Sequence, residues 1–308
     1  MNNIQIKKLC ICLKTIQDMI RWTISQFNKS NIFYGHGTNN SFDESIKLVL
    51  GSIDVSFNLP NYIYNSNLTY NEKKIIIKRV KKRIKYRIPL PYIINKTWFC
   101  NIEFYIDKRV LIPRSPIGEI LLKKINRMFF LNKPNHILDL CTGSGAIAIA
   151  CSYIFKKSIV DAVDICSDAL SITELNIKKH FMEKKVFPIK SNLFSNLPTN
   201  FYDLIITNPP YVKRQDIKNL PKEFFYEPIK SLDGGKDGLF FIKKILYFAS
   251  KYLNKNGILI CEVGYQMLNL IKKYPKVPFK WIKLFNGGEG IFYLNYFYLN
   301  KYKKYFIN

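Results

Sequence analysis

Histidine and acidic residues are scarce in this sequence. The 308 residues include 3 histidines and 22 aspartates and glutamates, against 48 lysines and arginines. Seven cysteines are present, but no two form a CxxC pair, so the sequence offers no pattern typical of a zinc site or another metal site. Their odd number argues against a disulfide framework, and free thiols in a reducing cytoplasm are expected.

Long apolar runs are missing as well. The N-terminus has two lysines before a short apolar run, but Lys14 interrupts that run and no small-residue cleavage site follows. We therefore expect an amphipathic helix there rather than a signal peptide. No apolar stretch reaches the roughly 20 residues that span a bilayer, so the sequence predicts a cytoplasmic protein that does not bind membranes.

The surplus of lysine gives a formal net charge of +26. This charge suits a nucleic acid or an RNA-rich particle as partner. The sequence is also rich in Ile, Asn, Tyr and Phe, which is the pattern expected when AT-biased coding moves surface positions toward Lys and Asn. Composition alone leaves both explanations of the charge open. Hydrophobic residues at 48% and charged residues at 23% predict a folded chain.

Three segments of the chain differ in pattern. Residues 1–95 lack a glycine-rich loop and show the periodicity of helices. The helices expected there are Ile4–Asn28, Phe42–Leu50 and Asn71–Ile88. Residues 96–114 hold an aromatic stretch, Trp98–Tyr105, that predicts a β-hairpin, and prolines follow it. We interpret residues 96–114 as a linker to a domain formed by residues 115–308.

Residues 115–308 alternate short apolar strands with helices. The expected strands are His136–Cys141, Ser158–Ile165, Val186–Lys190, Asp203–Thr207 and Gly257–Val263. Helices fit between them at Ser167–His180 and Gly238–Leu253. This alternation predicts an α/β fold with a doubly wound, mostly parallel sheet. Phe279–Phe285 and Gly290–Phe297, joined by the turn NGGE, predict an antiparallel C-terminal hairpin that completes seven strands.

A glycine-rich loop follows the first of these strands, in LDLCTGSGAIAIA. Its residues Cys141, Thr142, Gly143, Ser144 and Gly145 are candidates for ligand binding, since the glycines allow a tight turn and a close approach of the backbone. The loop is neither a GxGxxG dinucleotide fingerprint nor a Walker loop. NAD and ATP are therefore poor candidates for its ligand.

Two more motifs follow later strands. Asp164 ends the second strand, where a carboxylate can accept both hydroxyls of a ribose. An N-cap role for Asp164 is the alternative, but Ser167 or Asp168 would serve it better. The fourth strand stops at NPPY, residues 208–211, because proline cannot donate to a sheet ladder. An amide and an aromatic ring thus flank two rigid prolines.

Glycine loop, Asp164 and NPPY together resemble the S-adenosylmethionine-dependent methyltransferases of Rossmann-like class I. The resemblance implies that the loop contacts the methionine part of the cofactor and that Asp164 holds its ribose. NPPY resembles the (N/D/S)PP(Y/F/W) signature of enzymes that methylate a planar nitrogen. In that family the Asn208 side-chain oxygen and the Pro209 carbonyl accept the N–H groups of the substrate. Pro210 adds stiffness, and Tyr211 packs on the planar group.

The adenine contact is implied by resemblance at KSNLF, residues 190–194. The family usually has Ser-Asp at this place, whereas Asn192 follows Ser191 here. Its amide oxygen can still accept from the adenine amino group, and Leu193 can add apolar contact to the ring. Asn208 is also expected to border the cofactor. Since the methyl donor is already activated, catalysis needs mainly alignment and no strong general base.

NPPY occurs both in adenine methyltransferases and in enzymes that methylate the side-chain amide of glutamine. The order of helical domain, hairpin, LIPR segment and catalytic domain resembles the protein glutamine N5-methyltransferases, in which the first domain helps to dock the substrate. Within this family the chain is most similar to the branch acting on the third protein of the large ribosomal subunit. Segments carrying that similarity include NIFYGHGT, RVLIPRSPIGE, LPKEFFYEP, GILICEVG and NGGEGIF.

Three alternatives remain at this level. Methylation of peptide chain release factors is the sister activity, but that branch typically has a PRP-type sequence where this chain has Pro113–Pro116. Methylation of nucleic-acid adenine would call for a base-recognition domain, and none is evident, so DNA is not an expected partner. A non-catalytic protein that binds RNA or the ribosome is the third alternative, against which the intact motifs argue.

Overall fold

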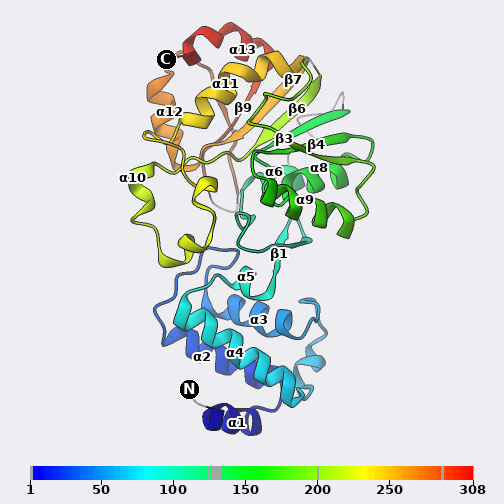
Figure 1. Cartoon of the computed structure of the whole chain (residues 1–308), viewed down its shortest axis with the longest axis vertical. Helices are drawn as coiled ribbons and strands as arrows, with labels where there is room; N and C mark the ends of the chain where they lie inside the picture. The colour runs from blue at the N-terminus through cyan, green and yellow to red at the C-terminus, as the bar shows by residue number, and fades with distance from the viewer. Residues whose placement is uncertain (1–2, 124, 126–132, 200, 286–287, 308) are drawn as a thin grey trace. The chain divides into compact units, whose positions relative to one another are not determined.

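The computed structural model describes residues 3–123, 125, 133–199, 201–285 and 288–307 (Figure 1). The chain forms two compact units. The first contains Met1–Thr97 together with Pro221–Tyr226, and the second contains Trp98–Leu220 and Glu227–Asn308. None of the helices in the described ranges has the length and apolar character needed to cross a membrane. The roles predicted for the domains stay predictions.

The first unit is helical. Its elements are α1 (Asn3–Cys12), α2 (Ile16–Asn28), α3 (Ser41–Ser52), η1 (Asn61–Asn65), α4 (Tyr70–Tyr86), α5 (Leu90–Ile94) and η2 (Lys222–Tyr226). The single helix predicted for Ile4–Asn28 is wrong, because it is two helices. Thr15 is the N-cap of α2 and forms a capping box with Asp18, so a new helix begins in the middle of the apolar pattern.

A buried charge cluster joins several elements of this unit. Arg83 of α4 is 1% exposed and contacts Glu44 of α3 (2.5 Å) and Glu223 of η2 (3.0 Å). Arg87 adds a second ion pair to Glu223 at 2.6 Å, and the backbone N–H of Phe33 donates to the same carboxylate. Burial opposes ionisation, but these donors outweigh it and lower the pKa of Glu223 to about 2.

The predicted aromatic hairpin is present. β1 (Lys96–Phe99) and β2 (Ile102–Tyr105) form a two-stranded sheet. Its turn residues, Cys100 and Asn101, both have positive φ, at 51° and 62°. Two successive positive φ angles give the twist that a tight hairpin needs.

The second unit is built on a seven-stranded sheet of order β5-β4-β3-β6-β7-β9-β8. The strands are β3 (His136–Leu140), β4 (Ile159–Asp164), β5 (Val186–Lys190), β6 (Tyr202–Thr207), β7 (Leu253–Glu262), β8 (Lys280–Trp281) and β9 (Ile291–Asn295). Neighbours from β5 to β7 pair in parallel, and β9 pairs antiparallel with both β7 and β8. The predicted fold class is confirmed. Part of the expected NGGE turn, residues 286–287, lies outside the described residues.

Helices cover both faces of this sheet (Figure 1). Along β3, Ile137 packs in a core with α6 (Ile117–Lys123) and α8 (Ala146–Ile154), near α9 (Ser167–Lys179). Leu138 and Leu140 pack in the opposite core with α11 (Phe240–Tyr252), α12 (Met267–Lys273) and α13 (Tyr296–Lys301). Strands buried on both faces explain why the sequence shows continuous apolar runs there. The short helices are α10 (Arg214–Ile217), η3 (Ile229–Ser231), η4 (Gly264–Gln266) and η5 (Lys303–Ile307).

Candidate active site

The motif-bearing loops follow the carboxyl ends of four adjacent parallel strands, β5, β4, β3 and β6. They border a cavity of ≈ 720 Å³. The predicted site residues that line it are Cys141, Gly143, Asp164, Asn192, Leu193, Asn208 and Pro210. The predicted site residues that do not are Thr142, Ser144, Gly145, Pro209 and Tyr211. The fold thus gathers most of the predicted residues around one space, as is usual at the carboxyl edge of a doubly wound sheet.

The glycine loop is a tight turn that packs against α9. Cys141, Gly143 and Gly145 all have positive φ. A Cβ added to Gly143 would meet nothing within 4 Å, whereas one added to Gly145 would lie 2.9 Å from Thr173. Gly143 therefore leaves its backbone open toward the cavity, while Gly145 allows the loop to pack against α9.

Asp139 of β3 supports the same loop from inside the sheet. One of its carboxylate oxygens accepts from the Thr142 hydroxyl (2.6 Å) and from the backbone N–H of Ala148 (3.0 Å). Burial raises the pKa of Asp139 to about 7. On the other side, Asn176 of α9 donates to the Ser144 carbonyl at 2.9 Å. Thr142 and Ser144 thus shape the loop without lining the cavity.

Asp164 both stabilises the glycine loop and lines the cavity. Its two carboxylate oxygens accept from the backbone N–H groups of Gly143 (3.0 Å) and Cys166 (2.9 Å). The residue also lines the cavity, and each oxygen keeps a second lone pair for a ligand. Burial raises the pKa of Asp164, against the effect of these N–H donors. The hydrogen bond to Gly143 fixes the acid relative to the glycine loop.

Asn208, the first residue of the NPPY segment, has a side-chain oxygen that no described residue satisfies. It follows β6, and its side-chain oxygen is buried without a hydrogen-bond partner among the described residues. Leaving a buried acceptor unsatisfied costs about 1–3 kcal/mol, so such atoms are rare and call for an explanation. Because Asn208 also lines the cavity, a ligand N–H there would satisfy it.

Tyr211 points to a partner that the sequence did not reveal. Its hydroxyl donates to Glu262 at 2.9 Å, and the Ser115 hydroxyl donates to the other oxygen of that carboxylate. Glu262, at the end of β7, is 3% exposed, and burial raises its pKa. A Cβ on Gly264 would lie 2.7 Å from the Tyr211 ring. The ring is therefore wedged between a glycine and a buried acid.

Further cavity residues escaped the sequence analysis as site candidates. Arg109, Val110 and Leu111 line the cavity, and they begin the RVLIPRSPIGE segment that carried the family resemblance. The segment is anchored by Arg114, which pairs with Glu227 at 2.5 Å. The other lining residues that were not predicted include Arg214, Lys230, Asp233, Phe240 and Phe241. No motif in the sequence marks these last residues.

Metal ligands do not gather here: within the described part of the chain, no group of three or more His, Cys, Asp or Glu could hold a metal ion. Cys141 lines the cavity, but burial raises the pKa of its thiol, so it is not an activated nucleophile.

Known proteins resemble this chain in sequence over nearly its whole length. The methyltransferase small domain family matches residues 118–244. A protein of Francisella tularensis named ribosomal protein uL3 glutamine methyltransferase is 45% identical over 292 residues, covering 94% of this chain and 93% of that protein. The chain belongs to the uL3 glutamine methyltransferase family. This confirms the family predicted from the sequence motifs.

A second member of the uL3 glutamine methyltransferase family, from Neisseria gonorrhoeae, is 36% identical over 283 residues, covering 92% of this chain and 94% of that protein. Among solved structures, the ribosomal protein L11 methylase of Lactobacillus delbrueckii subsp. bulgaricus has a TM-score of 0.42 and 19% identity, covering 61% of this chain and 81% of that chain. The assignment rests on the two family members, and the chain is a methyltransferase.

Proposed function

We propose that this enzyme transfers a methyl group from S-adenosylmethionine to the side-chain amide nitrogen of a glutamine in ribosomal protein uL3. Family membership supports the substrate, since both relatives carry this activity in their names. The main structural support for the chemistry is that Asn208 lines the cavity and that its side-chain oxygen is buried without a hydrogen-bond partner among the described residues. A glutamine amide supplies the N–H donor that this oxygen lacks.

The cavity suits S-adenosylmethionine as methyl donor. Gly143 leaves an open backbone face, where a side chain would intrude. Asp164 offers lone pairs to ribose hydroxyls, and Asn192 and Leu193 offer a polar and an apolar contact for adenine. When bound, the cofactor supplies a methyl group already activated by a sulfonium. The protein residues then have to hold and orient the two reactants.

The amide of glutamine is a poor nucleophile because its nitrogen lone pair is delocalised into the carbonyl. In our proposal the Asn208 oxygen and the Pro209 carbonyl accept the two N–H groups, so that the nitrogen is turned toward the methyl group. The two prolines restrict the backbone that carries both acceptors. Orientation of this kind can account for much of a rate enhancement.

Tyr211 contributes to catalysis by fixing the conformation of the NPPY segment. Its ring is fixed by Glu262 and Gly264, so it holds the end of the NPPY segment in one conformation. Contact of the ring with the substrate amide stays a prediction. A ribosomal protein as substrate would place the enzyme in the cytoplasm, and either free uL3 or an assembling ribosomal particle would fit.

Incubation with methyl-labelled S-adenosylmethionine tests the proposal. Purified uL3 and a peptide chain release factor are offered separately, and the labelled peptides are identified by mass spectrometry. Label on a glutamine of uL3 alone is the expected result. Label on the release factor alone would assign the enzyme to the sister activity and contradict our proposal.

A further inference from the structure

The C-terminal segment carries a dense positive charge. Residues 263–308 contain eight lysines and a single acidic residue, Glu289. Helices α12 and α13 lie in this segment, and their apolar sides pack in the same core as α11. The charged side chains therefore remain at the surface. The lysines Lys272, Lys273, Lys276, Lys301 and Lys304 are all exposed.

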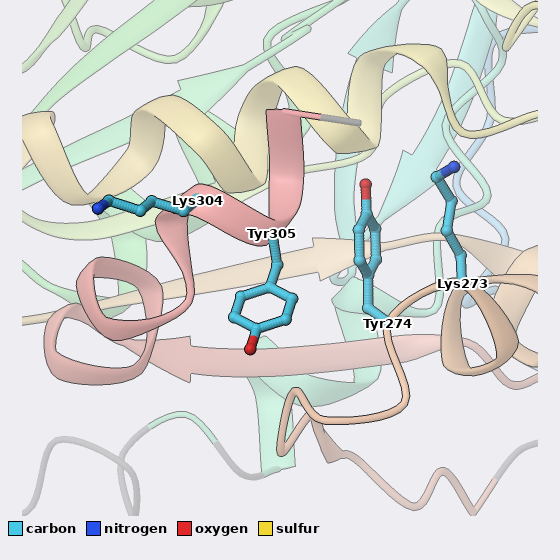
Figure 2. A pocket seen from close by; sticks show the side chains of 4 residues that line it. All are labelled: Lys273, Tyr274, Lys304 and Tyr305. Carbon is cyan, nitrogen blue, oxygen red and sulfur yellow. The ribbon is translucent and has the colours of Figure 1, made fainter.

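A cavity of ≈ 410 Å³ lies in this segment and is lined by Lys273, Tyr274, Lys304 and Tyr305. Figure 2 shows the two tyrosine side chains next to each other, with Lys304 on one side of them and Lys273 on the other. None of these residues lines the candidate active site.

The two tyrosines differ in exposure. Tyr274 is 4% exposed and packs edge-on against Phe306, with ring centroids 5.2 Å apart. Burial raises the pKa of Tyr274 to about 12, so its hydroxyl stays neutral. Tyr305 is 48% exposed, with the Tyr302 ring 5.8 Å away between centroids, so about half of its side chain is accessible to a ligand. One ring is thus part of the wall, and the other is accessible.

Two of the lysines lie near aromatic rings. The ammonium nitrogens of Lys273 and Lys276 are 5.9 Å from the ring centroid of Tyr274 and 6.0 Å from that of Tyr305. Among the described residues, no carboxylate lies within 4.0 Å of the Nζ of Lys273, Lys276 or Lys304. Their charge is therefore available to an anionic ligand.

We propose that these residues form a binding site for single-stranded RNA, here called the lysine–tyrosine surface: Lys273, Tyr274, Lys276, Lys304 and Tyr305. Lysines hold the phosphates, and the exposed ring of Tyr305 stacks on a base. Lys276 lies over the Tyr305 ring and Lys304 precedes Tyr305 in the chain, so cations flank this exposed ring as phosphates flank a base along a single strand. A duplex keeps its bases stacked inside and would use only the lysines. The choice of RNA over DNA rests on the proposed function, because uL3 is assembled on RNA.

Fluorescence anisotropy of the full-length protein with a labelled oligouridylate of about 16 nucleotides tests the site. Lys273→Gln combined with Lys304→Gln should weaken binding and reduce the slope of log affinity against log salt by roughly 1.4, since each phosphate on a single strand contributes about 0.7. Tyr305→Ala should weaken binding to the single strand about tenfold and leave binding to duplex RNA unchanged.

The matched control is Lys74→Gln with Lys78→Gln, which removes the same charge from exposed positions on α4. It should change affinity much less. An equal loss in this control, or no effect of Tyr305→Ala, would overturn the proposal in favour of diffuse charge. Loss of binding to vesicles of phosphatidylglycerol and phosphatidylethanolamine, with oligouridylate binding intact, would assign the surface to lipid instead.

Methyl transfer to isolated uL3 separates this inference from the proposed function. Variants of the lysine–tyrosine surface should methylate free uL3 at the wild-type rate, because none of these residues lines the active-site cavity. Wild-type protein that methylates uL3 but does not bind oligouridylate would overturn the RNA site alone. Oligouridylate binding without methylation of uL3 would leave the RNA site standing and overturn the proposed function.

Discussion

At the scale of the residue, Asp139 and Asp164 near the cavity have different roles. Asp139 is fully buried and fastens the glycine loop through Thr142 and Ala148. Asp164 also bonds the loop, through the N–H of Gly143, but it faces the cavity. A ligand in the cavity can therefore reach Asp164 and not Asp139.

Replacing Asp164 by alanine should weaken cofactor binding. The variant loses both the proposed ribose contacts and the hydrogen bond that fixes Gly143. Because hydrogen bonds to charged groups contribute roughly 1.5–3 kcal/mol, we expect the dissociation constant of S-adenosylmethionine to rise at least tenfold. Isothermal titration calorimetry measures this constant. Asp168→Ala, an exposed aspartate at the start of α9, is the control; an unaltered constant in Asp164→Ala would show the ribose assignment to be wrong.

The bond between Tyr211 and Glu262 offers a second test at this scale. Tyr211→Phe keeps the ring but leaves one oxygen of a buried carboxylate without its donor, which costs about 1–3 kcal/mol. We expect kcat to fall while the dissociation constant of the cofactor stays the same, since neither residue lines the cavity. Equal turnover in variant and wild type would mean that the position of the ring does not matter for catalysis.

At the scale of the element, the segment Pro221–Tyr226 stands out. Its neighbours in sequence belong to the methyltransferase unit, but the segment clusters with the helical unit, where Glu223 binds Arg83 and Arg87. Removing one partner of a buried ion pair leaves an uncompensated charge. The helical unit therefore depends on a segment that lies more than a hundred residues further along the chain.

Glu223→Gln should destabilise the helical unit by about 3–5 kcal/mol. The wild-type pKa of about 2 lies below the usual glutamate value of 4.5, so the stabilisation is complete above pH 4.5 and is lost as the pH falls toward 2. The variant should lack this part of the pH dependence. Urea unfolding between these pH values measures both effects. Glu183→Gln, at an exposed site, is the control; the same acid profile in Glu223→Gln and wild type would refute the assignment.

At the scale of the whole molecule, local patterns predicted the methyltransferase sheet well. Apolar strands and intervening helices are continuous in sequence, and the positions of β3 to β7 follow from them. The break between α1 and α2 was missed, although Thr15 and Asp18 have the spacing of a capping box. The apolar periodicity continues across this break, so periodicity alone predicts one helix where the capping residues start a second one.

The site was predictable only in part, for a related reason. Gly143, Asp164 and Asn208 belong to motifs that each follow a strand, so their convergence follows from the fold. Glu262 was not predicted, although a carboxylate inside the apolar stretch GILICEV is an unusual residue for a buried strand. Its pairing with Tyr211 and Ser115 joins positions far apart in sequence, which no local pattern encodes.

The central claim is that Asn208 orients the amide that receives the methyl group, and turnover of Asn208→Ala on uL3 tests it most directly. Loss of one oriented acceptor should lower kcat/KM about 100- to 1,000-fold, with the cofactor dissociation constant nearly unchanged. Asn208→Asp, which keeps an acceptor oxygen, should lose less than the alanine variant. Wild-type turnover in Asn208→Ala would contradict the claim.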